Sequence, residues 1–215
     1  MKRVSVLIFA VVLLISSGCG SSSNTTNTTA YSLSQIASLT TGHSLSINVS
    51  GTDTQGNSYT GTFQQIVEGP TTLNGNSVTE QRTLLTLTEV NVGQVSVVEL
   101  FYWNTNGTLN EILFTSGITG TCTNNFAYPS TVQIGESFAG ASLSLSNGTT
   151  YTSNWTVSDG GNGNAELTLT GNTNTGLAEQ DVWVITPAGT VVSYMQTTYN
   201  FPAAGVTTTL TGAPM

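Results

Sequence analysis

The sequence predicts an all-β, antiparallel fold, either a β-sandwich or a partly open barrel. From about residue 44 onward, apolar and polar residues alternate with a period of two, which is typical of half-buried strands. Asn74-Gly75, Asn106-Gly107 and Asn147-Gly148 interrupt these runs, and Asn-Gly supplies the positive φ angles that tight hairpins need. The spacing of turns predicts about ten or eleven strands, as expected for a sandwich or a barrel.

The chain begins with a basic pair, Lys2 and Arg3, followed by an apolar run over residues 4–15 and by small residues at 16–18. This order is typical of a secretory signal peptide. The apolar run is shorter than the roughly 20 residues that a helix needs to cross the hydrocarbon core, which argues against a permanent transmembrane anchor. We therefore expect residues 1–18 to be removed on export.

Cys19 follows the small residues, and the run Leu14–Cys19 resembles the lipobox of bacterial lipoproteins. It departs from the family at Ser16, where leucine is preferred. The resemblance implies cleavage before Cys19, a diacylglycerol on its thiol and usually an acyl group on its freed amine. Two or three acyl chains hold a protein stably on a membrane, whereas one holds it marginally. Because Gly20 rather than aspartate follows the cysteine, the resemblance implies the outer membrane as the destination.

After the cysteine the chain contains only Gly, Ser, Asn, Thr and Ala up to residue 30, a composition that favours a flexible tether. Leu33, Ile36 and Leu39 then lie three residues apart and predict a short helical turn. Alternation predicts strands around residues 45–49, 143–145, 155–157 and 167–169.

Two stretches of the chain are similar to two later ones. Tyr59–Phe63 is similar to Tyr151–Trp155, and Phe101–Thr108 is similar to Val182–Thr190. The similarity suggests a body made of two related β-meanders.

We therefore divide the chain into three parts. These are a signal peptide (1–18), a lipidated cysteine with its tether (19–30) and an all-β body (31–215). The two meanders would occupy residues 31–120 and 126–215 of the body.

The charge of the body excludes some partners. Removal of residues 1–18 would leave Arg82 as the sole Lys or Arg against eleven Asp and Glu residues, a net charge of −10 (1 − 11). Affinity for nucleic acid comes from cationic side chains that neutralise phosphates, so nucleic acid binding is excluded. Attraction of a basic patch to anionic lipid headgroups is excluded for the same reason. The membrane contact would then depend on the acyl chains of Cys19.

Few residues suggest chemistry. His43 is the only histidine, and Cys122 is the only cysteine besides Cys19. The body therefore cannot supply a set of transition-metal ligands, and it cannot form an internal disulfide. Glycosidases use a pair of carboxyl groups, and Glu179 and Asp181 lie on the same face of a predicted strand. We interpret these two residues as solvated surface rather than as such a pair. The stretch Asp159–Glu166 could bind calcium, but it fits a turn better. No cofactor-binding fingerprint occurs.

Aromatic residues are the remaining candidates for binding. Trp103, Trp155 and Trp183 all lie in predicted strands, and Tyr102 adjoins the first of them. If exposed together they could form a platform for a carbohydrate or an apolar ligand, although such residues more often fill a core.

These observations predict a lipid-anchored protein of the cell envelope, without catalytic activity, in a binding or structural role. The alternatives are a carrier or chaperone for lipids or other apolar molecules and, third, an enzyme acting on polysaccharide. A transmembrane β-barrel would also show alternating segments, but many strands place Thr or Ser on both faces, where such a barrel needs an apolar band.

Overall fold

The computed structural model describes residues 29–89, 93–200 and 205–215. Cys19 and the signal peptide lie outside the described residues. The strands of the described part are β1 (Tyr31–Ser32), β2 (Ser44–Asp53), β3 (Ser58–Leu73), β4 (Asn76–Glu89), β5 (Gly93–Asn104), β6 (Leu109–Phe114), β7 (Thr119–Cys122), β8 (Thr131–Val132), β9 (Ser137–Leu145), β10 (Thr150–Gly161), β11 (Asn164–Thr173), β12 (Ala178–Ile185), β13 (Val191–Tyr199) and β14 (Thr207–Pro214).

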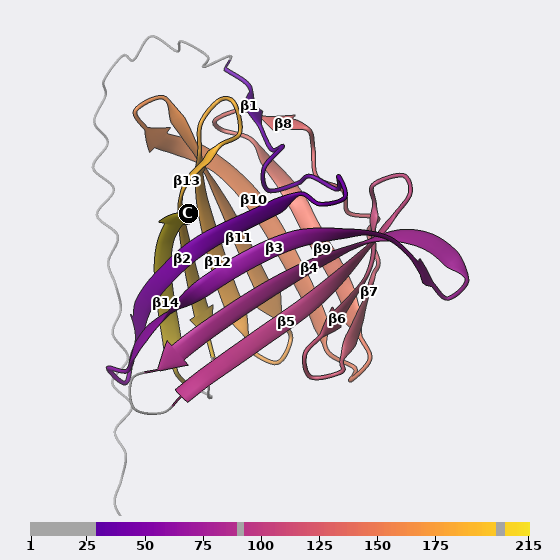
Figure 1. Ribbon diagram of the computed structural model, residues 1–215, viewed down its shortest axis with the longest axis horizontal. Coiled ribbons are helices and arrows are strands. Elements are labelled where there is room, and N and C mark those ends of the chain that lie inside the picture. The colour runs from indigo at the N-terminus through magenta and orange to yellow at the C-terminus, as the bar shows by residue number, and fades with distance from the viewer. Residues whose placement is uncertain (1–28, 90–92, 201–204) are drawn as a thin grey trace, which may run out of the picture.

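Twelve of these strands form one closed antiparallel barrel in the order β10-β11-β12-β13-β14-β2-β3-β4-β5-β6-β7-β9 (Figure 1). The prediction of an all-β antiparallel fold is confirmed. Of the two architectures that the sequence left open, the chain adopts the barrel, and β14–β2 and β7–β9 pairing closes it fully. Closure removes the free strand edges that would otherwise invite pairing with other chains.

The barrel consists of two runs of six consecutive strands, β2 to β7 and β9 to β14. A two-residue strand precedes each run, and these two strands, β1 and β8, pair with each other outside the barrel. The similar sequence stretches fall on equivalent strands. The first pair lies on β3 and β10, the second strand of each run, and the second pair begins on β5 and β12, the fourth strand.

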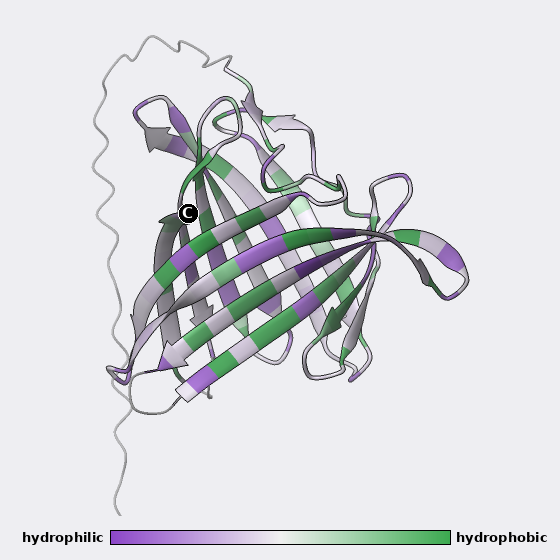
Figure 2. Cartoon of the chain, viewed as in Figure 1, coloured by the Kyte–Doolittle hydropathy of each residue, from purple (hydrophilic) through white to green (hydrophobic). Residues whose placement is uncertain are grey.

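Alternation along the strands separates the core from the surface. Leu45, Ile47 and Val49 of β2 point inward and are buried, whereas Asn48 and Ser50 between and after them are exposed. The same alternation of apolar and polar residues can be followed along β3, β4 and β5 in Figure 2. The interior is therefore the hydrophobic core, and the outer face is mostly Ser, Thr, Asn and Gln.

Glycines permit two sharp features of the sheet. Asn74 and Gly75 join β3 to β4 with φ angles of 50° and 82°, the left-handed conformation that a two-residue hairpin turn requires. Within β3, a Cβ on Gly61 would lie 1.8 Å from the carbonyl oxygen of Thr86 on β4. No side chain fits there, so glycine allows the two backbones to approach where the barrel wall curves.

Residues 31–37 and 126–132 cover one end of the barrel, and we call them the cap. Tyr31, Leu33, Phe126 and Val132 of the cap are buried. The amide of Ala37 donates to the carbonyl of Leu33 at 2.8 Å, so the segment makes one hydrogen-bonded turn, which does not continue as a helix to Leu39.

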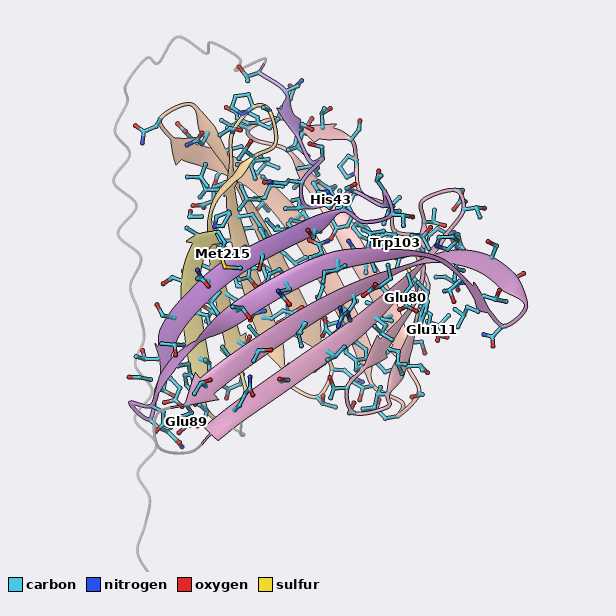
Figure 3. All side chains as sticks on the ribbon, in the orientation of Figure 1. His43, Glu80, Glu89, Trp103, Glu111 and Met215 are labelled. Atoms are coloured by element: carbon cyan, nitrogen blue, oxygen red, sulfur yellow. The ribbon has the colours of Figure 1, made fainter. Side chains whose placement is uncertain are left out.

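Side chains fasten the cap to the barrel. Gln65 Nε2 of β3 donates to the carbonyl of Ile36 at 3.0 Å. His43 Nε2 donates to the carbonyl of Gln35 at 2.8 Å, which gives the only histidine a structural partner. Gln35 in turn accepts the amide of Val191 at 2.5 Å. In Figure 3, His43 and Trp103 lie toward the cap, and Glu89 lies at the opposite end of the barrel.

Candidate functional site

A cavity of about 390 Å³ lies inside the barrel. It extends from Ile36 of the cap to Ser116 and Ile118 in the hairpin between β6 and β7, which is at the uncapped end. Ser116 is exposed, so the cavity reaches the surface at this end. A barrel of twelve strands encloses more space than its wall residues alone can fill, and the cap and large aromatic side chains occupy only part of it.

Aromatic side chains form much of the wall. Near the cap, Tyr128 packs against Trp103 and Phe126, with ring centroids 5.7 and 4.9 Å apart. Across the barrel, Trp183 of β12 packs against Tyr194 of β13 with centroids 4.4 Å apart. Such rings bury large apolar areas and prefer these tilted and edge-on arrangements. The wall therefore suits an apolar or aromatic guest.

A second group of lining residues is acidic. Glu99 of β5, together with Glu179 and Asp181 of β12, points into the cavity. Each is half-buried, and its remaining exposed surface faces the cavity. Burial, with the charge of Glu179 as a second cause, raises the pKa of Glu99 from 4.5 to about 7. Burial also raises the pKa of Glu179, and burial followed by the charge of Glu179 raises that of Asp181.

Hydroxyl groups orient these carboxyl groups. Tyr151 donates to Glu179 Oε1 at 2.5 Å, and Tyr194 donates to Asp181 Oδ1 at 3.2 Å. Thr83 donates to Glu99 Oε2 at 3.4 Å. Because hydrogen bonds to the ionised carboxylate favour it, the two tyrosines partly oppose the effect of burial on Glu179 and Asp181.

Gly171 makes the Tyr151 contact possible. Tyr151 lies on β10, and Glu179 lies on β12, with β11 between them. A Cβ on Gly171 of β11 would lie 2.2 Å from the Tyr151 hydroxyl oxygen, so the ring crosses β11 where a side chain is missing. Glycine at position 171 therefore leaves the space through which the Tyr151 side chain reaches Glu179 across β11.

Gln81 of β4 supplies a buried donor. Its Oε1 accepts the indole N–H of Trp103 at 3.0 Å, and the residue is 2% exposed. Gln81 lines the same cavity, and its Nε2, which is buried, has no hydrogen-bond partner within the described ranges. An unpaired buried N–H group is costly, and a polar atom of a guest would satisfy it.

The aromatic residues that the sequence singled out divide between two faces. Trp103, Trp155 and Trp183 are buried and line the cavity, so the structure brings these three together. Tyr102 points the other way, to the outer face of β5. Its pKa is raised by partial burial and by the charges of Glu80 and Glu111, which lie near each other in Figure 3.

Other candidates have structural surroundings. Cys122 ends β7, half-buried, and its Sγ donates to Asn124 Oδ1 at 3.3 Å. Asp159 accepts the amide of Gly161 at 2.9 Å at the end of β10, and the predicted turn is the two residues between Gly161 and Asn164 of β11. The interpretation of Glu179 and Asp181 as solvated surface is wrong, because their strand face is the inner wall of a closed barrel.

The described part of the chain is thus a capped, twelve-stranded antiparallel barrel with an aromatic and acidic cavity. No protein family, curated protein or solved structure shows significant similarity to this chain. Within the described ranges, no helix has the length and apolarity to span a membrane.

Proposed function

We propose that this chain is a non-catalytic lipoprotein of the cell envelope that binds a small, largely apolar molecule inside its barrel and serves as its carrier. The cavity is the observation that favours this role over a purely structural one. Sites for small molecules measure about 300–1,000 Å³ and combine apolar walls with a few placed polar groups. A cavity of about 390 Å³ with three tryptophans and a few polar side chains agrees with that description.

Attachment to the envelope rests on the sequence before the barrel. The small residues before Cys19 and the uncharged tether after it favour a lipid anchor, by resemblance to bacterial lipoproteins. The described chain begins beside the cap, whereas the cavity reaches the surface at the other end of the barrel. A guest could therefore enter away from the point where the tether joins the fold.

The arrangement gives less support to an enzyme acting on polysaccharide. Glu179 and Asp181 do have raised pKa values, which catalytic acids often share. They lie, however, inside a closed barrel that is capped at one end, where a polymer chain could not pass. A small guest fits this geometry better.

The experiment is to express the full chain in a bacterial host, purify it and extract it with organic solvent for mass spectrometry. Binding of N-phenyl-1-naphthylamine, a neutral fluorescent apolar probe, is titrated in parallel. Leu169 lines the cavity and Thr170, its neighbour on β11, is exposed, so Leu169→Trp fills the cavity and Thr170→Trp is the matched control.

We expect wild type and Thr170→Trp to bind the probe saturably, at about one site per chain, and Leu169→Trp to lose most of this binding. An extracted molecule found with wild type but not with Leu169→Trp would support the proposal further. Absence of saturable probe binding in wild type, or equal binding by folded Leu169→Trp, would overturn it.

A further inference from the structure

The three carboxyl groups in the cavity face no positive side chain of the described chain. Arg82 is the single Arg or Lys in the described ranges, and its Nε pairs with Glu68 Oε1 at 3.0 Å on the outer face. His43 donates to a carbonyl in the cap. Three of the chain's eleven acidic residues therefore share an apolar interior without a counter-charge from these residues. Buried charges in proteins are normally paired, since isolation costs several kcal/mol.

The acids are held in position rather than left loose. Tyr151 and Tyr194 each donate to one of them, and Gly171 leaves room for the first of these bonds. Glu99 approaches from β5, on the other run of strands, with Thr83 as its donor. A set of carboxyl groups fixed from two sides of a cavity is a site for a positive group placed between them.

Gln81 gives an independent indication of a guest. The residue lines the same cavity, and its Nε2 is buried and unpartnered among the described residues. This donor cannot recognise a positive group, so it calls for an acceptor atom elsewhere on the same guest, near Trp103. The cavity thus presents acceptors in one region and has an unpaired donor beside it in another.

The aromatic side chains around the carboxyl groups favour an organic cation over a metal ion. Phe63, Trp183 and Tyr194 pack together, with Phe63 and Tyr194 stacked at 5.2 Å, and Tyr194 also contacts Asp181. Aromatic faces beside carboxylates attract amines and quaternary ammonium groups through cation–π interactions. Within the described ranges, the acidic residues do not gather closely enough to form a metal-binding group.

We propose that the ligand of this cavity is an organic cation, a protonated amine or quaternary ammonium compound with an apolar body, whose charge lies among Glu99, Glu179 and Asp181. This inference rests on the proposed carrier function and adds the class of its ligand. The body of the ligand lies along Trp103 and Trp155 toward the cap, where an acceptor atom meets Gln81.

Binding of such a cation depends on pH, because it requires ionised carboxylates. The titratable groups that line the site are Glu99 on β5, Glu179 and Asp181 on β12, Tyr151 on β10 and Tyr128 in the cap. Tyr194 on β13 lies behind them and donates to Asp181. The pKa values of the tyrosines are raised by burial first, so the tyrosines remain neutral donors. The acids take up protons as the pH falls, and the affinity for a permanent cation falls with it.

The test compares three probes of similar size by quenching of tryptophan fluorescence. Benzyltrimethylammonium carries a permanent charge, neopentylbenzene is its neutral isostere, and 3-phenylpropionate is an anion. Each is titrated into wild type at pH 8 and pH 5. The variants Glu179→Gln and Glu99→Gln remove one cavity charge each, and Glu166→Gln, on the outer face of β11 beside Ser158, is the matched control. Circular dichroism verifies that each variant is folded.

We expect the cation to bind at least about tenfold more tightly than its neutral isostere at pH 8, since a buried charge-assisted contact supplies that difference. Its affinity should fall at pH 5 and in either cavity variant but not in Glu166→Gln. Equal affinity for the cation and the isostere, or tighter binding of the anion, would overturn the cationic ligand while leaving the carrier function standing. Failure of all three probes and of the neutral naphthylamine would overturn both.

Discussion

Glu99→Gln should stabilise the protein at pH 8 and have little effect at pH 4. Burial raises the pKa of Glu99 from 4.5 to about 7, so the folded protein binds its proton more tightly than the unfolded chain does. The stabilisation is complete below about pH 4.5 and is lost as the pH rises to 7. At about 1.4 kcal/mol per pH unit, this interval corresponds to about 3 kcal/mol of unfolding free energy. Glutamine is neutral at every pH and can still accept the Thr83 hydroxyl.

Urea denaturation at pH 4, 6 and 8, followed by tryptophan fluorescence, measures this effect. The three tryptophans are buried, so their emission reports unfolding of the barrel. Wild type should lose stability between pH 4 and 8, and Glu99→Gln should lose less of it. Glu166→Gln should follow wild type. A variant that is no more stable than wild type at pH 8, or an equal gain at pH 4, would refute a buried and charged Glu99.

Four further predictions follow from particular contacts. Desolvation would raise the pKa of Asp53, but hydrogen bonds from Asn57, Tyr59 and Gln55 outweigh it and lower this pKa to about 2. The stability that the ionised Asp53 contributes is therefore lost as the pH falls from 3.8 to 2. A pH series of thermal midpoints should show this loss in wild type but not in Asp53→Asn. Gly171→Ala should push Tyr151 away from Glu179 and cost about 1–3 kcal/mol in urea denaturation, whereas an unchanged midpoint would contradict the close contact. Trp103→Phe should cost about 2 kcal/mol, because it leaves a gap and removes the donor to Gln81; a cost below about 0.5 kcal/mol would contradict the packing. Cys19→Ser should move the protein from the detergent phase to the aqueous phase or leave it uncleaved, and wild type without fatty-acid labelling would refute the lipid anchor.

The sequence predicted the strands and turns because their signals are local, although its count of about ten or eleven strands is too low for the fourteen of the described residues. Alternation around Leu45 and the Asn74-Gly75 pair each determine a conformation over a few residues. Closure of the sheet depends on pairing between β2 and β14, which lie at opposite ends of the body, and no local pattern reports it. The choice between a sandwich and a barrel therefore stayed open.

The aromatic part of the site could be predicted, but the acidic part was misread. Trp103, Trp155 and Trp183 were identified as candidates, although the sequence could not show that they surround one cavity. A usable signal for the acids was present. Glu99 lies an even number of residues from Trp103, so both are on the same face of β5, and Asp181 and Trp183 share a face of β12 in the same way. An acid on the face of a buried tryptophan points inward.

The packing of the cap could not be read from the sequence. Tyr128 and Phe126 lie in a stretch of the chain without alternation, between β7 and β8. They enter the cavity wall only because β1 and β8 pair over the end of the barrel. Contacts of this kind depend on the completed fold.

The central claim is that a small cationic molecule binds inside the barrel. Crystals of the purified protein grown at pH 8 with (4-bromobenzyl)trimethylammonium would test it directly, because bromine gives an anomalous diffraction signal at its own position. We predict one strong bromine peak inside the barrel, between Trp103 and Trp155, with the ammonium group beside Glu179 and Asp181. Bromine peaks confined to the outer surface, or a probe inside the barrel with its ammonium group turned away from all three carboxyl groups, would contradict the claim.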